Sequence, residues 1–363
     1  MTNRLEKEKL TCFHDCPRII KFNIIMKKFS VVLATYTGVN TVNRTLNSIL
    51  TQQSVNTAFE VVVVIDGPNK AIREIVVTKE KEFKRNNIPL MIKQFTKNRG
   101  RFEARIAGAR LACFNQLLLV DDRVRLSKNY FKVLQIINKD IVMANVIEVA
   151  GRKTNIISQT LFFVRRRIFG SKYGNDFADY YINSSNFETS PKGTTSLWIT
   201  KEVFLGSCKE VVHGRRQSNK YVNEDTKILR AVVNKGHNIF RSSKLIAFYL
   251  PRGNLYNAIK HLYERGPRFV DYYIKPGTRF FPILALAYLV PIGIVIGLLF
   301  RPELLYLTLI LTVALMVLVA IAISRNLKEL TVSLAGLLLI GLVFSLGIWK
   351  GTVILIKELP FKK

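Results

Sequence analysis

The sequence predicts an α/β domain with a mostly parallel sheet between helices, followed by a C-terminal transmembrane helical region. Two observations carry this prediction. Between residues 29 and 250, short apolar runs typical of buried strands alternate with amphipathic helical segments. Three uncharged runs then follow, over residues 281–300, 304–324 and 331–349. As helices, runs of this length reach roughly 30 Å, the thickness of a bilayer core.

The predicted strands are continuous apolar runs, as expected where helices cover both faces of a sheet. They lie at residues 30–34, 61–65, 90–92 and 117–120. The first intervening segment has apolar residues at helical spacing, including Val42 and Leu46. Because the connections are short, this βαβ order predicts parallel strands whose carboxyl ends meet at one edge, where a ligand site is expected.

Composition and charge limit the classes of function. The 363 residues include 55 Lys and Arg against 25 Asp and Glu, a formal net charge of +30, and 49% are hydrophobic. The apolar fraction excludes a disordered chain, and the uncharged runs exclude an ordinary soluble protein. The basic excess predicts an anionic partner. Anionic membrane lipid is favoured over nucleic acid, because the sequence has no recognised nucleic-acid-binding motif.

The expected organisation has five parts along the chain. They are an N-terminal extension (1–25), the α/β domain (26–250), interfacial helices (251–280), about three transmembrane segments (281–350) and a basic tail (351–363). Within the third part, residues 255–273 alternate aromatic and basic side chains, a pattern typical of a helix lying on anionic lipid.

The orientation of the spans stays open. An odd number of spans, three, would put the C-terminal tail on the side of the membrane opposite the basic α/β domain. Basic residues favour the cytoplasmic side, however, and Lys350 and Lys357 therefore favour the cytoplasm for the tail as well as for the domain. A re-entrant segment at residues 281–300, which Pro291 interrupts, would remove this conflict.

Polar residues stand where three of the predicted strands end. These residues are Thr35 and Tyr36, then Asp66, then Asp121, Asp122 and Arg123. A carboxylate at such an edge can bind ribose hydroxyls or hold a divalent cation that neutralises a diphosphate. Each acid alone is equally consistent with an ordinary turn residue, but their convergence on one edge favours a site.

A second acidic pair, Glu224 and Asp225, begins a predicted helix that ends at Gly236. Acidic residues in a first turn often only complement the helix dipole. Taken alone, the pair therefore favours capping over catalysis.

In their order along the chain, these motifs resemble the family 2 glycosyltransferases, which carry a Rossmann-like GT-A fold. The matching stretches are FSVVLATYTGVNTVNRTLNSILTQQ, VVVVIDG, NRGRFEARIAGARLACFNQLLLVDDRV, Gly193-Thr194-Thr195 and the acidic pair. The resemblance covers roughly residues 29–270, and its specificity lies in the ordered set. Tyr263-Glu264-Arg265-Gly266, followed by apolar helices, is similar to the succinoglycan-type glucosyltransferases that build exopolysaccharide.

The resemblance implies a role for each motif. It implies nucleotide-sugar contacts at Thr35, Tyr36, Asp66, Arg105, Asp121 and Arg123. Asp225 matches the base that deprotonates the acceptor hydroxyl. The implied chemistry is direct displacement at the anomeric carbon with inversion, from a nucleoside-diphosphate sugar (expected to be a UDP-sugar) to a polyprenyl-linked acceptor.

One residue departs from the family's Asp-x-Asp motif, because Arg123 stands where the metal-binding acid is expected. Either Asp122 takes over as ligand of Mg²⁺ or Mn²⁺, or the Arg123 guanidinium itself neutralises the diphosphate. A third alternative is loss of activity. We expect Asp122 to be the metal ligand.

Signals for the acceptor are weaker. The Gln-x-x-Arg-Trp signature of processive synthases is absent from the sequence, so we expect a single sugar addition. Candidate acceptor-binding residues are Glu224, Arg265 and Arg268. A basic segment with Arg215, Arg216 and Lys220 could bind a lipid diphosphate or form a solvated loop.

The leading hypothesis is a membrane-bound inverting glycosyltransferase that adds one sugar to a hydroxyl of a lipid-linked saccharide in cell-surface polysaccharide synthesis. It would be a multi-pass protein of the cell membrane with its catalytic domain on the cytoplasmic side. One alternative is a polyprenyl-phosphate glycosyl synthase, whose ionised phosphate acceptor needs no base. Another is a catalytically inactive GT-A membrane scaffold.

Overall fold

The structure is a computed structural model that describes residues 27–52, 58–149, 154–174, 177–212 and 221–358. The expected N-terminal extension, the segment with Arg215, Arg216 and Lys220, and residues 359–363 of the expected basic tail lie outside these residues, whereas residues 351–358 of that tail are helical.

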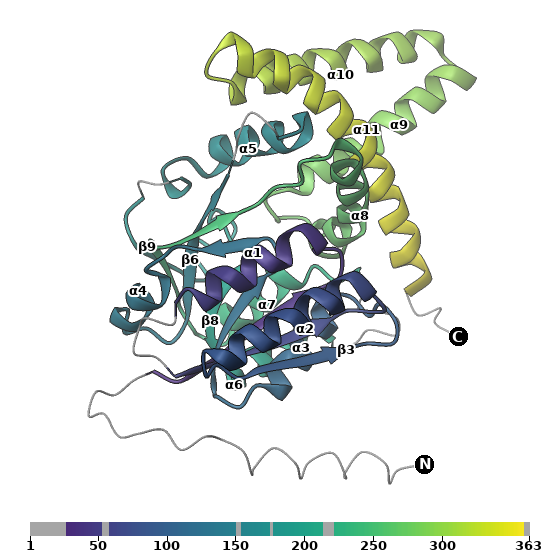
Figure 1. The fold of residues 1–363 in the computed structure, drawn as a ribbon. Coiled ribbons are helices and arrows are strands. Elements are labelled where there is room, and N and C mark those ends of the chain that lie inside the picture. The colour runs from purple at the N-terminus through teal and green to yellow at the C-terminus, as the bar shows by residue number, and fades with distance from the viewer. Residues whose placement is uncertain (1–26, 53–57, 150–153, 175–176, 213–220, 359–363) are drawn as a thin grey trace.

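A sheet of nine strands, counted over the described residues, forms the centre of the N-terminal part (Figure 1). Its order is β3-β2-β1-β4-β8-β6-β9-β5, and β7 pairs with β9. The strands are β1 (Phe29–Thr35), β2 (Phe59–Ile65), β3 (Leu90–Gln94), β4 (Gln116–Asp121), β5 (Val124–Leu126), β6 (Val142–Glu148), β7 (Tyr180–Ile182), β8 (Ser196–Thr200) and β9 (Ile239–Tyr249).

Helices cover both faces of this sheet. On one face lie α1 (Val39–Leu50), α2 (Lys70–Arg85) and α4 (Tyr130–Ile136), and on the other lie α3 (Arg101–Leu111), α6 (Lys201–Val212) and α7 (Glu224–Asn234). Because side chains alternate along a strand, Val31 and Leu33 of β1 join the first core while Val32 and Ala34 join the second. Burial on both faces explains why the strand sequence is continuously apolar.

The predicted fold class is confirmed. The expected strands are β1 to β4, and β1 pairs in parallel with both β2 and β4, as β2 does with β3. Beyond β4 the sheet becomes mixed, because β8 runs antiparallel to both β4 and β6. That second half was not predicted strand by strand.

Three apolar helices follow at the C-terminal end, and each is long and apolar enough to cross a membrane. They are α9 (Phe281–Leu299), α10 (Pro302–Ile323) and α11 (Leu327–Glu358). The interruptions expected near Pro291 do not break α9, which continues through this proline. Gly297 instead serves close packing, since a Cβ there would lie 2.5 Å from the Leu305 backbone nitrogen of α10.

Two helices connect the sheet domain with α11: α5 (Ile156–Phe169) and α8 (Leu255–Tyr273) (Figure 1). The bounds of α8 coincide with the predicted aromatic and basic helix. A Cβ on Gly266 would lie 2.0 Å from the Gly347 carbonyl carbon, so the backbones of α8 and α11 touch. The α8 helix is therefore fixed directly beside an apolar helix.

Candidate active site

Asp66 fixes the start of α3 at the carboxyl edge of the sheet. Its backbone N–H donates to the Thr35 carbonyl at 2.8 Å, which keeps β1 and β2 paired to their ends. Its carboxylate accepts hydrogen bonds from the backbone N–H groups of Arg99 at 2.7 Å and Gly100 at 3.0 Å. Gly100 has a φ of 94°, a conformation that favours glycine, and α3 begins at the next residue. The sharp turn thus starts α3 with Arg101 at this edge.

Two arginines of α3 and three carboxylates form what we call the arginine–carboxylate cluster: Arg101, Arg105, Asp121, Glu224 and Asp225. Arg105 is 1% exposed, and its Nη1 lies 2.9 Å from Asp225 Oδ1 and 3.2 Å from Glu224 Oε1. Its Nη2 donates to Asp121 Oδ1. One guanidinium therefore joins the end of β4 to the start of α7.

Arg101 lies on the solvent side of the same cluster. Its Nη2 is 2.8 Å from Asp225 Oδ2 and its Nη1 is 3.2 Å from Asp121 Oδ2, while its Nε donates to Glu224. The Arg101 side chain is 33% exposed, in contrast to the buried Arg105. Arg101 is therefore the member of the pair that an incoming anion can reach.

The electrostatics of the cluster favour ionised groups. Burial alone would raise the pKa of the Asp225 carboxyl, but Arg101 and Arg105 outweigh burial and hold that pKa well below its usual range. Burial opposes the charged form of Arg101, yet Asp225, Glu224 and Asp121 raise its pKa. Two guanidinium groups face three carboxylates, so the cluster keeps one formal negative charge in excess.

Sequence reasoning missed two members of this network. Arg101 has a signal in the sequence, because it lies four residues before Arg105 and so shares its helix face. Thr194 has no comparable signal: its buried hydroxyl donates to Asp225 Oδ1 and accepts from Arg105. The Gly193-Thr194-Thr195 stretch carried no assigned role until the fold brought it to α3.

Asp122 lies beside the cluster and faces the end of β1. Its Oδ2 accepts a hydrogen bond from the Thr35 hydroxyl at 2.8 Å, and its backbone carbonyl accepts one from Thr45 at 3.1 Å. Burial raises the pKa of the Asp122 carboxyl, and the Thr35 hydrogen bond opposes this. Tyr36, the next residue after Thr35, is 40% exposed.

Arg123 does not reach the carboxylates of the cluster with a hydrogen bond. Its Nη1 donates to the Leu250 carbonyl at 3.3 Å, and the Leu250 N–H donates back to the Arg123 carbonyl at 2.9 Å. The Arg123 side chain therefore points to the segment after β9. The pairing of β9 with β5, which follows Arg123, sets this orientation.

The donor set for a metal is limited. Among the residues that the structure describes, no group of three His, Cys, Asp or Glu side chains is arranged to hold a metal ion. Mg²⁺, however, is often bound by only one or two carboxylates together with substrate phosphates. Asp121, a member of this negatively charged cluster, and the adjacent Asp122 suit that mode of binding.

The candidate acceptor residues lie on the α7 and α8 side. The Glu224 side chain is only 7% exposed and pairs with both Arg101 and Arg105. It therefore positions these two arginines and has little contact with solvent. Burial and Arg101 lower the pKa of Arg268 on α8, whereas Glu224 and Asp225 raise it. Arg268 is thus electrostatically coupled to the cluster.

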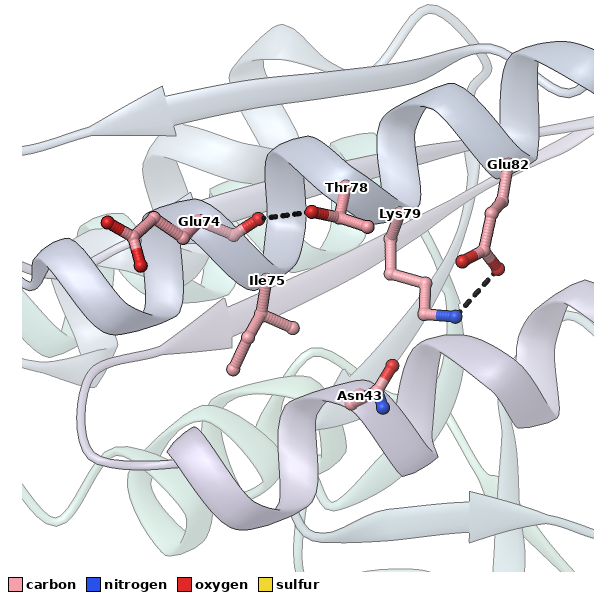
Figure 2. A pocket seen from close by; sticks show the side chains of 6 residues that line it. All are labelled: Asn43, Glu74, Ile75, Thr78, Lys79 and Glu82. Carbon is pink, nitrogen blue, oxygen red and sulfur yellow. Dashed lines mark hydrogen bonds and ion pairs between the residues drawn. The ribbon is translucent and has the colours of Figure 1, made fainter.

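A surface groove of about 300 Å³ between α1 and α2 lies apart from these residues (Figure 2). Its lining comprises Asn43, Glu74, Ile75, Thr78, Lys79 and Glu82. The Lys79 ammonium pairs with Glu82 at 2.6 Å. None of the predicted site residues lines this groove.

Comparisons with known proteins concern the family and the overall fold. The family description "Glycosyl transferase family 2" matches residues 30–187. No curated protein sequence matches the chain. Among solved structures, the chain is similar to the mannosyltransferase PcManGT from Pyrobaculum calidifontis in complex with GDP-Man and Mn²⁺, with a TM-score of 0.50 and 15% identity. That alignment covers 89% of this chain and 86% of the mannosyltransferase.

The chain is also similar to S. aureus TarS 1-349, with a TM-score of 0.46 and 18% identity over 73% of this chain and 80% of that chain. The same TarS fragment in complex with UDP-GlcNAc aligns with a TM-score of 0.47 and 14% identity, over 90% of this chain and 92% of that chain. At such identities only the overall fold is compared.

Proposed function

We propose that this protein is a membrane-bound inverting glycosyltransferase, because residues 30–187 match the family description "Glycosyl transferase family 2". It transfers one sugar from a nucleoside-diphosphate sugar to a hydroxyl of a polyprenyl-linked saccharide, in the synthesis of a cell-surface polysaccharide. The three apolar helices anchor it as a multi-pass protein with the catalytic domain on the cytoplasmic side.

The observation that carries this proposal is the arginine–carboxylate cluster. It joins acids from β4 and α7 at the edge of the sheet where Thr35 ends β1 and Asp66 follows β2. Asp225 is the carboxylate that takes the acceptor's proton, since its low pKa keeps it ionised at neutral pH. The acceptor oxygen then attacks the anomeric carbon while the nucleoside diphosphate leaves from the opposite face.

The same arginines that keep Asp225 ionised also weaken it as a base, because a proton-accepting group works best with a pKa near the working pH. The donor's diphosphate resolves this conflict by competing for the guanidinium groups. Arg101 is the group it reaches first, since one third of that side chain is exposed. Withdrawal of Arg101 from Asp225 raises the proton affinity of the carboxylate when the donor is in place.

The remaining site residues bind the donor. Thr35, Tyr36 and Asp66 contact the nucleoside at the ends of β1 and β2, and Arg105 and Asp121 hold the site beneath the diphosphate. Asp122, with Asp121, would hold Mg²⁺ or Mn²⁺, which supplies positive charge to the leaving diphosphate. The excess negative charge of the cluster supports the need for such a cation.

A polyprenyl-phosphate glycosyl synthase is the second candidate, and one observation favours it. The arginines hold the pKa of Asp225 so low that the carboxylate is a weak base, whereas a phosphate acceptor requires no base at all. The two functions differ in the acceptor atom that attacks.

The proposal is tested by the products. Membranes containing the protein are incubated with a panel of nucleotide sugars, and lipid extracts are analysed by mass spectrometry. We expect a lipid-linked product that is heavier by one sugar, and we expect it to disappear with Asp225→Asn but not with Asp179→Asn, an exposed acid bonded to Ser243. Absence of any donor-dependent product across the panel would contradict the proposal.

A further inference from the structure

A second pocket lies between α5, α8 and the segment that follows β9. Its basic lining residues are Arg165, Arg252, His261 and Arg265. Apolar side chains complete it, among them Ile157, Leu161 and Leu262. A pocket that combines cations with an apolar wall suits an amphiphile with an anionic head.

The cations of this pocket are poorly compensated. The pocket's one carboxylate, Glu148, is bonded by Arg165 at 2.5 Å and by the Tyr173 hydroxyl at 2.6 Å. Within the described part of the chain, the side chains of Arg252, His261 and Arg265 have no hydrogen bond or ion pair.

Their electrostatic environment favours the approach of a negative charge. Burial lowers the pKa of Arg265, and Arg165 and Arg268 lower it further. Burial and Arg252 also hold the pKa of His261 well below its usual range, so the cations of the pocket are its arginines. Unpaired buried cations are costly, and a bound anion would remove that cost.

Two neighbouring segments link this pocket to the surroundings of the arginine–carboxylate cluster. On one side, Arg123 forms hydrogen bonds with Leu250, and the pocket residues Pro251 and Arg252 follow Leu250 directly in the chain. On the other, Arg268 stands one helical turn beyond Arg265 on α8 and is coupled to Arg101 and Asp225. A ligand whose head is bound here is therefore held next to the reacting groups.

The pocket also adjoins the apolar helices. The α8 helix contacts α11 directly where Gly266 meets Gly347. Leu262 and Ile157, two lining residues, belong to a core cluster that includes Leu339 and Val343 of α11. An isoprenoid or acyl chain leaving the pocket would thus meet a surface suited to lipid.

We propose that the pocket lined by Arg252, His261 and Arg265 binds the diphosphate of the polyprenyl-linked acceptor, with its lipid chain directed along α11. This inference rests on the proposed function and adds the part of the acceptor that is recognised. A bilayer phospholipid offers the same phosphate chemistry, but it takes no part in the reaction, so a pocket near the cluster favours the acceptor over a phospholipid.

Binding can be measured without turnover, using the purified full-length protein in a neutral detergent and calorimetry. The probes are farnesyl diphosphate, farnesol and inorganic diphosphate, each with and without saturating UDP. We expect farnesyl diphosphate to bind with or without UDP, and farnesol to show no binding. Loss of one charged hydrogen-bond donor, as in Arg252→Gln or Arg265→Gln, should weaken binding about tenfold.

Two further variants separate the head-group contact from folding. Arg167→Gln removes an exposed arginine of α5 outside the pocket and should leave the affinity unchanged. Arg252→Lys combined with Arg265→Lys keeps the charge and should retain more affinity than the glutamine pair. Equal affinity of wild type and the glutamine variants would overturn the proposal.

A competition experiment distinguishes the two sources of phosphate. If phosphatidylglycerol displaces farnesyl diphosphate as effectively as farnesyl diphosphate displaces itself, the pocket serves bilayer lipid and the proposal is wrong. No sugar donor is used, so this binding experiment can be interpreted even if the protein transfers no sugar. Failure of the proposed function and failure of this inference are therefore separate outcomes.

Discussion

The Nη1 atom of Arg105 lies 2.9 Å from Oδ1 of Asp225, although 120 positions separate the two residues in the chain. This pair connects α3, the helix after β3, with the first turn of α7 across the carboxyl edge of the sheet. The buried guanidinium also bonds Asp121 at the end of β4. The spatial relationship of the candidate catalytic acids therefore depends on one arginine.

Replacing Arg105 is expected to cost far more stability than replacing Arg101. Arg105→Ala leaves Asp121 and Glu224 without a buried partner, so we predict a loss of about 3–5 kcal/mol in the free energy of unfolding. In Arg101→Gln the buried Arg105 still pairs with the same three carboxylates, and Arg101 itself is partly exposed, so the loss should be about 1 kcal/mol or less. Denaturant unfolding monitored by fluorescence checks the order; equal losses would contradict it.

Gly38 sits against Asp122 with no room for a side chain. A Cβ there would lie 2.1 Å from Asp122 Oδ2, so Gly38→Ala must push this carboxylate away from Thr35. We expect the chain to fold while the Mn²⁺ concentration for half-maximal activity rises about tenfold or more. Gly341→Ala is the matched control, since nothing lies within 4 Å of its added Cβ. Identical metal titrations for the two variants would argue against Asp122 as ligand.

Removal of divalent metal separates the two explanations for Arg123. We expect excess EDTA to abolish sugar transfer and added Mg²⁺ or Mn²⁺ to restore it, because the cluster has excess negative charge. Arg123→Ala should lower activity less than EDTA does, because the Arg123 guanidinium bonds the Leu250 carbonyl. The reverse pattern, with full activity in EDTA and none in Arg123→Ala, would assign the role of the cation to Arg123.

The contact between α8 and α11 leaves no space for a methyl group. Gly266→Ala would bring its Cβ to 2.0 Å from the Gly347 carbonyl carbon, and a backbone atom cannot move aside as a side-chain tip can. We predict a loss of about 1–3 kcal/mol in stability, typical of overpacking. Thermal unfolding of Gly266→Ala beside Gly341→Ala measures it. If Gly266→Ala and Gly341→Ala had the same thermal unfolding midpoint, α8 and α11 would have to lie further apart than in this structure.

The first half of the fold was predictable because its strands are buried on both faces. The run Val61 to Ile65 and its neighbours are apolar enough to identify without any long-range information. The strands in turn predicted where the polar site residues lie, because Asp121 ends β4 and Asp66 directly follows β2. The aromatic and basic helix α8 was likewise visible from its composition.

The rest depends on contacts that no local pattern encodes. Strands β5 and β7 have three residues each, too few for a periodicity. The hydrogen bond from Thr194 to Asp225 and the direction of Arg123 toward Leu250 arise from pairing between distant segments. The arginine pairing that lowers the pKa of Asp225 could not be read from the acidic pair alone.

The measurement that tests the account most directly is the rate of sugar transfer by Asp225→Asn. Wild type, Asp225→Asn and Asp179→Asn are compared with a lipid-linked saccharide as acceptor, and nucleotide-sugar binding is measured in parallel. We predict a rate about 10²–10⁴-fold lower for Asp225→Asn, with donor binding retained, and a normal rate for Asp179→Asn. Transfer by Asp225→Asn at the wild-type rate to this hydroxyl acceptor would contradict the account, and tolerance of the variant only with a polyprenyl phosphate would favour the synthase.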